Sequence, residues 1–220
     1  MKKITLFVVS LLLSSIIYSC GSMTYITDTW EKQGFTGKKF NKVIVMAVAK
    51  ENMVTRRLVE DAIVKDLKEK GINAIVSYDQ ISYDTFDKDK DGKVDDSKVA
   101  EEMIKSKVKE LEADGLLVLA LKDVKKDTKY VQGAPTYIPT YYYTPYYSYY
   151  FATYDRVYSP GYYVQNTDVY IESSVYDVQK EELVYTFMSE TVNPKSISDF
   201  TKSYSKALST TLVDQKVLLK

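Results

Sequence analysis

The residues best suited to chemistry lie in an acidic segment, residues 87–95 (DKDKDGKVD). Asp87, Asp89, Asp91 and Asp95 occupy positions 1, 3, 5 and 9 of a calcium-binding loop, with Gly92 at the tight turn. Lys93, at position 7, would contribute its backbone carbonyl. Position 12 is Lys98 where a bidentate Glu is expected. The segment therefore predicts either a structural calcium site or a solvated turn, in which Lys88, Lys90 and Lys93 offset the acidity.

The second candidate is a tyrosine-rich insertion, residues 131–164, which holds 12 of the 21 tyrosines and four of the five prolines. Tyrosine combines a rigid apolar face with a hydroxyl group, which suits a protein partner or the sugar rings of a cell-wall glycan. We expect the contacts from Tyr137, Tyr141, Tyr142, Tyr143, Tyr146, Tyr147, Tyr149 and Tyr150. Two alternatives remain open: a flexible low-complexity flap, or a patch packed on the edge of the protein's own sheet.

Composition excludes several kinds of activity. The 220 residues include no His and one Cys, so catalysis by Ser-His-Asp or Cys-His groups, His-ligated metals and internal disulfides are excluded. The 30 basic and 30 acidic residues balance, and the insertion has only Asp155 and Arg156 as charges, so no nucleic-acid partner is expected. Neither a glycine-rich phosphate loop nor a facing carboxylate pair is evident. We expect no catalysis and no cofactor other than possible calcium.

The amino terminus has the pattern of an export signal. Lys2 and Lys3 precede an apolar run over residues 4–18, which is shorter than the roughly 20 residues of a membrane span. Residues 17–21 (IYSCG) resemble the lipobox of bacterial lipoproteins. That resemblance implies cleavage after residue 19 and acylation of Cys20, which would anchor the protein in a membrane. The alternative is an ordinary secretory signal. Residues 21–27 lack an acidic cluster, and by the same resemblance we expect a periplasm-facing position on the outer membrane.

Hydrophobic periodicity predicts one α/β domain over residues 42–220, preceded by a signal peptide (1–19) and a tether (20–41). Expected strands cover residues 43–49, 74–78, 115–124, 168–178 and 182–192, and helices cover 52–70, 97–111 and 197–212. The first helix would bury Val54, Leu58, Val59, Ala62, Ile63 and Leu67, and the second Val99, Met103, Ile104, Val108 and Leu111. This βαβαβ–ββα order predicts helices packed on a sheet with parallel core strands and a carboxyl-terminal antiparallel hairpin.

Three segments carry a family resemblance. Residues 112–118 (EADGLLV), and the pair 175–178 (VYDV) and 183–185 (LVY), resemble strand entries and a hairpin of TolB amino-terminal-like and CsgG-like periplasmic domains. Residues 56–60 (RRLVE) and 74–78 (AIVSY) are similar to segments of small envelope lipoproteins. The resemblance implies a binding or assembly module of the cell envelope. The alternatives are a carbohydrate-processing enzyme or its accessory subunit, with the tyrosines as a sugar platform, and a purely structural lipoprotein.

Overall fold

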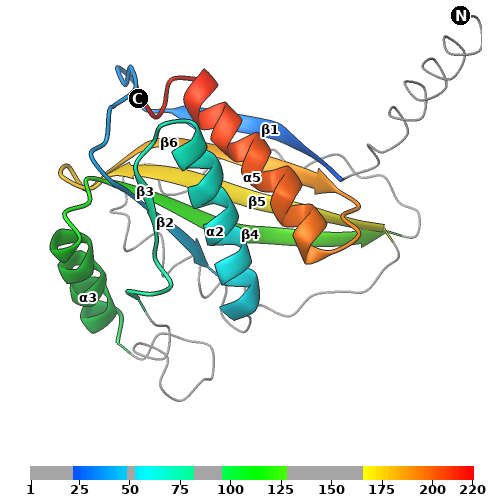
Figure 1. The fold of residues 1–220 in the computed structure, drawn as a ribbon, viewed down its shortest axis with the longest axis horizontal. Coiled ribbons are helices and arrows are strands. Elements are labelled where there is room, and N and C mark those ends of the chain that lie inside the picture. The colour runs from blue at the N-terminus through cyan, green and yellow to red at the C-terminus, as the bar shows by residue number, and fades with distance from the viewer. Residues whose placement is uncertain (1–21, 49–52, 82–95, 128–165) are drawn as a thin grey trace, which may run out of the picture.

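The computed structural model describes residues 22–48, 53–81, 96–127 and 166–220. Within these ranges the chain forms one six-stranded mixed sheet with helices packed against it (Figure 1). The strands are β1 (Met23–Glu31), β2 (Val43–Val48), β3 (Ala74–Val76), β4 (Gly115–Asp127), β5 (Asn166–Asp177) and β6 (Glu182–Val192); the helices are α2 (Met53–Glu69), α3 (Ser97–Glu110) and α5 (Ile197–Asp214). The strand order is β1-β6-β5-β4-β2-β3. The predicted α/β fold is confirmed.

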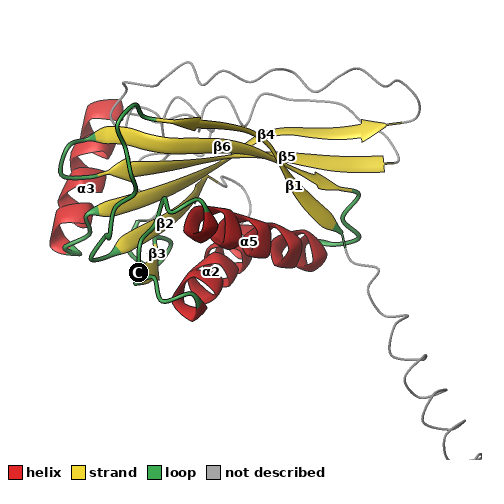
Figure 2. Cartoon of the chain, turned by 90° about the horizontal axis from the view of Figure 1, so that it is seen from above, coloured by secondary structure: helices red, strands yellow, loops and turns green. Residues whose placement is uncertain are grey.

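The parallel part of the sheet consists of β3, β2 and β4. Val43 of β2 lies opposite both Ala74 of β3 and Gly115 of β4. Because β3 and β4 flank β2 on opposite sides, the chain reverses its direction across the sheet after β3. Right-handed crossovers then place α2 and α3 on opposite faces. Figure 2 shows this arrangement, with α2 and α5 on one face of the sheet and α3 on the other.

The antiparallel part contains β4, β5 and β6, and it includes the predicted hairpin. The pairing of β4 with β5 runs from Gly115 opposite Asp177 to Asp127 opposite Asn166. In the turn between β5 and β6, Glu181 has a φ of 53°, in the left-handed region that glycine adopts most easily. The chain thus makes the hairpin with a non-glycine residue at a strained position.

The expected tether is wrong for residues 23–31, which form the edge strand β1. The strand pairs antiparallel with β6, from Met23 opposite Val192 to Glu31 opposite Tyr185. Most of its side chains are exposed, so main-chain pairing contributes most to holding it, with Ile26 and Trp30 packed at the margins of the two cores. Such a polar edge strand lacks the alternation by which strands are recognised in a sequence. Phe40 is also buried, so the domain begins before residue 42.

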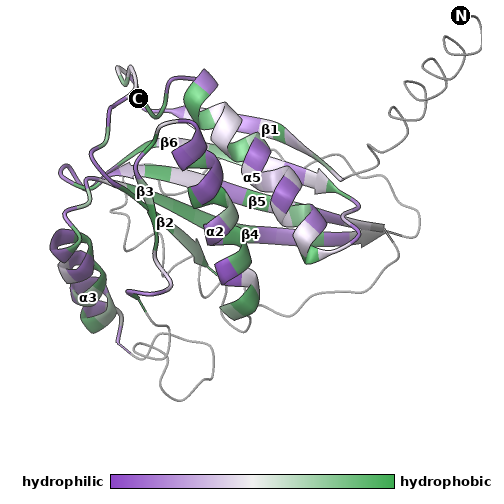
Figure 3. Ribbon diagram, in the orientation of Figure 1, coloured by the Kyte–Doolittle hydropathy of each residue, from purple (hydrophilic) through white to green (hydrophobic). Residues whose placement is uncertain are grey.

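One hydrophobic core lies on each face of the sheet. The continuous apolar run of β2 predicted this burial on both faces. Val43, Val45 and Ala47 face α2 and α5, whereas Ile44, Met46 and Val48 face α3. Figure 3 shows β2 and the first half of β4 as hydrophobic, while the distal half of β4 is hydrophilic.

The buried faces of two helices differ from the expected ones. Val54 and Leu58 of α2 are 67% and 43% exposed, and Val99 of α3 is 56% exposed. The buried face of α2 instead includes Arg56 and Glu60. An expectation based on apolar residues alone therefore places the buried face of α2 at the wrong angle around the helix. Arg56 and Glu60 can be buried there because they form an ion pair with each other.

Candidate functional site

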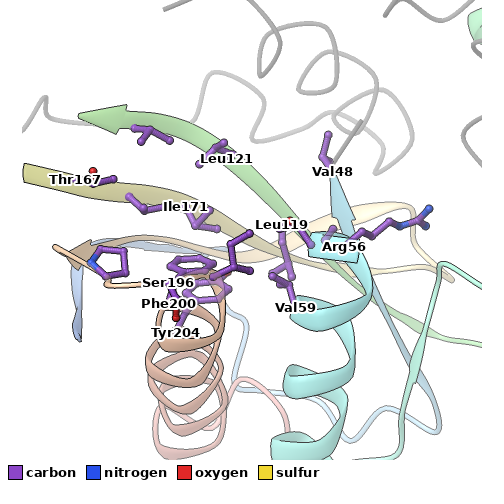
Figure 4. A pocket seen from close by; sticks show the side chains of 16 residues that line it. Val48, Arg56, Val59, Leu119, Leu121, Thr167, Ile171, Ser196, Phe200 and Tyr204 are labelled. Atoms are coloured by element: carbon purple, nitrogen blue, oxygen red, sulfur yellow. The ribbon is translucent and has the colours of Figure 1, made fainter. Parts of the chain in front are cut away.

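An apolar cavity of about 480 Å³ lies between the sheet and the first turns of α2 and α5 (Figure 4). It adjoins the carboxyl end of β2, the edge at which parallel sheets form ligand sites. Its principal walls are Leu119 and Leu121 of β4, Val169 and Ile171 of β5, Val59 of α2 and Phe200 of α5. This size lies within the range of about 300–1,000 Å³ that is typical of small-molecule sites.

The α5 wall of the cavity is fixed by an aromatic pair. Phe200 and Tyr204 are one helical turn apart, and their rings stack with a centroid distance of 5.4 Å and an interplanar angle of 10°. The buried Tyr204 hydroxyl is 2.8 Å from Oγ of Ser173 on β5. Burial raises the pKa of Tyr204, so the phenol stays neutral. Its polar atom is therefore engaged with the sheet, and the ring alone faces the cavity.

The wall formed by α2 is supported by the fully buried carboxylate of Glu60. Its Oε1 accepts hydrogen bonds from the backbone N–H of Ala47 at 3.0 Å, from Nε of Arg56 at 2.9 Å and from Oγ of Ser77 at 2.9 Å. Its Oε2 accepts from the backbone N–H groups of Ser77 at 2.7 Å and Tyr78 at 3.0 Å. Four of these five donors join α2 to β2 and to the end of β3, and the fifth, Nε of Arg56, lies on α2 itself.

The guanidinium of Arg56 is also fully buried and donates its hydrogen bonds within the same network. Its Nη1 donates to the carbonyl of Ile81 at 3.0 Å, and its Nη2 donates to Oγ of Ser77 at 2.7 Å. Figure 4 shows the side chain extending away from Ile171 and Phe200. The aliphatic stem of Arg56 therefore lines the cavity, while its charge is neutralised by Glu60 behind the wall.

The apolar lining of this cavity favours the binding of an apolar group. A polar ligand buried there would lose its hydrogen bonds to water, at a cost of about 1–3 kcal/mol for each unpaired group. Each buried CH₂ group would contribute about 0.8 kcal/mol in favour of binding. Among the described residues, no group of three or more Cys, Asp or Glu side chains is placed to hold a metal ion.

A buried carboxyl group lies on the opposite face of the sheet. Glu172 of β5 is 0% exposed, and neither of its oxygens has a hydrogen-bond partner within the described part of the chain. Nζ of Lys122, at a bulge in β4, is 3.6 Å from Oε2. Burial raises the pKa of Glu172 to about 7, although Lys122 opposes the change. This carboxyl therefore titrates near neutral pH.

The first described residue is fixed beside the cavity. The backbone N–H of Ser22 donates to Oδ1 of Asp199 at 3.2 Å, and its Oγ donates to the Asp199 carbonyl at 3.1 Å. Hydrogen bonds from the backbone N–H groups of Lys195 and Ser22 lower the pKa of Asp199, so the carboxylate stays charged. Asp199 lies in the first turn of α5, between the cavity-lining residues Ile197 and Phe200.

The residues predicted as sites lie outside the described ranges. They are the lipid-attachment residue Cys20, the calcium-loop residues Asp87, Asp89, Asp91, Lys93 and Asp95, and the tyrosines Tyr137, Tyr141, Tyr142, Tyr143, Tyr146, Tyr147, Tyr149 and Tyr150. Their roles stay predictions. Of the helices within the described ranges, none has the length and hydropathy needed to cross a membrane.

The cavity and the Arg56–Glu60 pair were not predicted as functional features. The spacing of four residues between Arg56 and Glu60 was a usable signal, because opposite charges at that spacing lie on one helical face. The cavity had no comparable signal. Its walls come from β2, α2, β4, β5 and α5, and the aliphatic residues among them have the pattern of ordinary core positions.

Comparison with known proteins gives structural similarity only. No protein-family model matches the chain, and no curated protein matches it. A solved PelC dodecamer from Paraburkholderia phytofirmans shares 10% identity and a TM-score of 0.43, over 90% of this chain and 100% of that chain. The L103M variant of the PelC dodecamer from the same organism shares 9% identity and a TM-score of 0.41, over 83% of this chain and 96% of that one.

Proposed function

We propose that the chain is a lipid-anchored, non-catalytic binding or assembly module of the bacterial cell envelope. In this proposal acyl groups on Cys20 hold it on the outer membrane, and the domain faces the periplasm. The single observation that carries the proposal is the position of Ser22. This residue follows the lipobox-like segment by one position and is hydrogen-bonded to the first turn of α5 beside an apolar cavity. The anchored end and a binding surface therefore share one end of the domain.

The polar chemistry of the cavity walls favours binding over catalysis. A general acid or base must reach its substrate with a free polar atom. Here the Tyr204 hydroxyl bonds Ser173, and the charges of Arg56 and Glu60 are turned into an internal network. Arg56 and Tyr204 therefore present hydrocarbon to the cavity. The tyrosine-rich insertion stays the predicted surface for an envelope protein or a glycan.

A binding experiment in envelope extract tests this function. The chain from residue 20, with Cys20→Ser to keep it soluble, is immobilised beside a version in which residues 132–163 are replaced by a Gly/Ser linker. Retained proteins and glycans are identified by mass spectrometry. We expect a partner that the intact chain retains and the linker version does not.

Two results would count against the proposal. If both versions retain the same set, or nothing, the insertion is not a binding surface. If purified cell-wall glycan is cleaved by the intact chain, and not merely retained, the protein is an enzyme and the carbohydrate-processing alternative replaces the binding module.

A further inference from the structure

We propose that the cavity between the sheet, α2 and α5 binds the hydrocarbon chain of a membrane lipid. The inference deepens the proposed function and depends on it only for the membrane that supplies the lipid. The cavity itself belongs to the described residues, so its ligand can be tested in a chain that carries no lipid anchor.

The interior of the cavity selects for hydrocarbon. Aliphatic side chains of β4 and β5 form one side, and the ring of Phe200 forms the other. Among the polar lining residues, the Tyr204 hydroxyl bonds Ser173 and the Arg56 guanidinium bonds Glu60, Ser77 and Ile81. Ser196 Oγ accepts from the backbone N–H of Asp199, and Thr55 and Thr167 each add one hydroxyl group. A sugar would therefore find too few partners for its many hydroxyl groups, whereas an alkyl chain needs none.

The cavity is lined in part by the first turn of α5, which lies at the end of the domain that the anchor would hold to the membrane. Cys20 precedes Ser22 by two residues, which span at most about 7 Å of extended chain. Ser22 is bonded to Asp199, and Ile197 in the same helical turn lines the cavity and is 45% exposed. Met23 and Val192, which pair at the adjacent edge of the sheet, are 57% and 40% exposed.

This placement explains why the ligand would come from the membrane. Ile197 is exposed on the face of the sheet that α5 covers. Met23 and Val192 are exposed on the opposite face at the same edge, because their neighbours Thr24 and Thr191 face α5, where Thr24 contacts Ser203. Against a bilayer surface, the exposed Ile197 in the cavity lining would lie on lipid. A lipid chain would then pass from the bilayer into the cavity without crossing water, which is the unfavourable step for a hydrocarbon.

The test measures lipid binding by the chain from residue 20 with Cys20→Ser. The probe is cis-parinaric acid, a polyene fatty acid whose fluorescence rises in apolar surroundings, with palmitic acid as competitor and hexanoic acid as short-chain control. Val169→Trp places a larger side chain in the cavity, and Leu121→Asn places an unpaired amide there. Val99→Trp, on the exposed face of α3, is the matched control. Thermal unfolding verifies that each variant is folded.

We expect saturable binding that palmitic acid displaces and hexanoic acid does not. Val169→Trp and Leu121→Asn should each weaken it at least tenfold, and Val99→Trp should leave it unchanged. The inference is overturned if the probe does not bind, or if binding is the same in the cavity variants and the control. Displacement by soluble glycan or peptide instead of palmitic acid would also overturn it. Acylation of Cys20 is measured separately on the full chain, so failure of the anchor and failure of the cavity give different results.

Discussion

Replacing the buried Glu172 by Gln should change how stability depends on pH. Burial raises the pKa of this carboxyl from 4.5 to about 7. Between these two values the folded protein holds a proton that the unfolded chain has released, so the free energy of unfolding falls as pH rises. One pKa unit corresponds to about 1.4 kcal/mol, and the buried carboxylate therefore costs about 3 kcal/mol above pH 7. Glu172→Gln removes the titrating group and with it this loss.

Urea unfolding of the chain from residue 20, with Cys20→Ser, measures the effect at intervals from pH 4.5 to 8. We expect Glu172→Gln to be close to the parent protein at pH 4.5 and more stable by up to about 3 kcal/mol at pH 8. Glu110→Gln is the matched control, because it removes an exposed carboxyl of α3 and leaves Glu172 in place. Parallel pH curves for the parent and Glu172→Gln would refute the reasoning, since Glu172 would then be ionised at no cost.

Three further predictions follow from the fold and the acidic segment. Glu60→Gln should destabilise the protein by about 3–5 kcal/mol in urea unfolding, because it leaves the Arg56 charge buried without its counter-ion. The control Glu69→Gln, on the exposed side of α2, should cost less than about 1 kcal/mol. Equal losses of stability in the two variants would contradict the role of the network. Gly37→Ala should destabilise the protein far more than Gly34→Ala. Both glycines have a positive φ, but a Cβ on Gly37 would lie 1.9 Å from the Lys216 carbonyl oxygen, whereas a Cβ on Gly34 would meet nothing within 4 Å. If the acidic segment binds calcium, millimolar calcium should raise the melting temperature and Asp91→Asn should abolish the rise; an unchanged melting temperature would exclude the site.

The parallel part of the sheet could be predicted from the sequence because β2, β3 and the first half of β4 are apolar runs joined by helices. Residues 43–49 are apolar on every position, which in a strand requires burial on both faces. The strand β1 could not be predicted in this way. Its Thr24 is held by Oγ contacts of 2.8 Å to Thr191 and 2.9 Å to Ser203, which belong to distant parts of the chain. Contacts of that kind leave no local pattern.

The candidate site was predicted less well, for a related reason. Sequence motifs mark sites whose ligands are close together along the chain, as in residues 87–95. The cavity is formed by side chains as distant as Val59 and Phe200, and its character depends on where the Arg56 guanidinium points. The same arginine beside an unpaired cavity wall would make an anion site. Only the placement of Glu60 and Ser77 turns its charge away and leaves an apolar surface.

The most direct test of the lipid-anchored module is the mass of its amino-terminal peptide. The full chain is expressed in a Gram-negative bacterium, the outer membrane is isolated, and the peptide is analysed by mass spectrometry beside a Cys20→Ala control. The account predicts a peptide that begins at Cys20 and carries acyl groups, and loss of membrane retention in the control. A peptide that retains residues 1–19, or a Cys20 without lipid in a protein that is still retained, would contradict it.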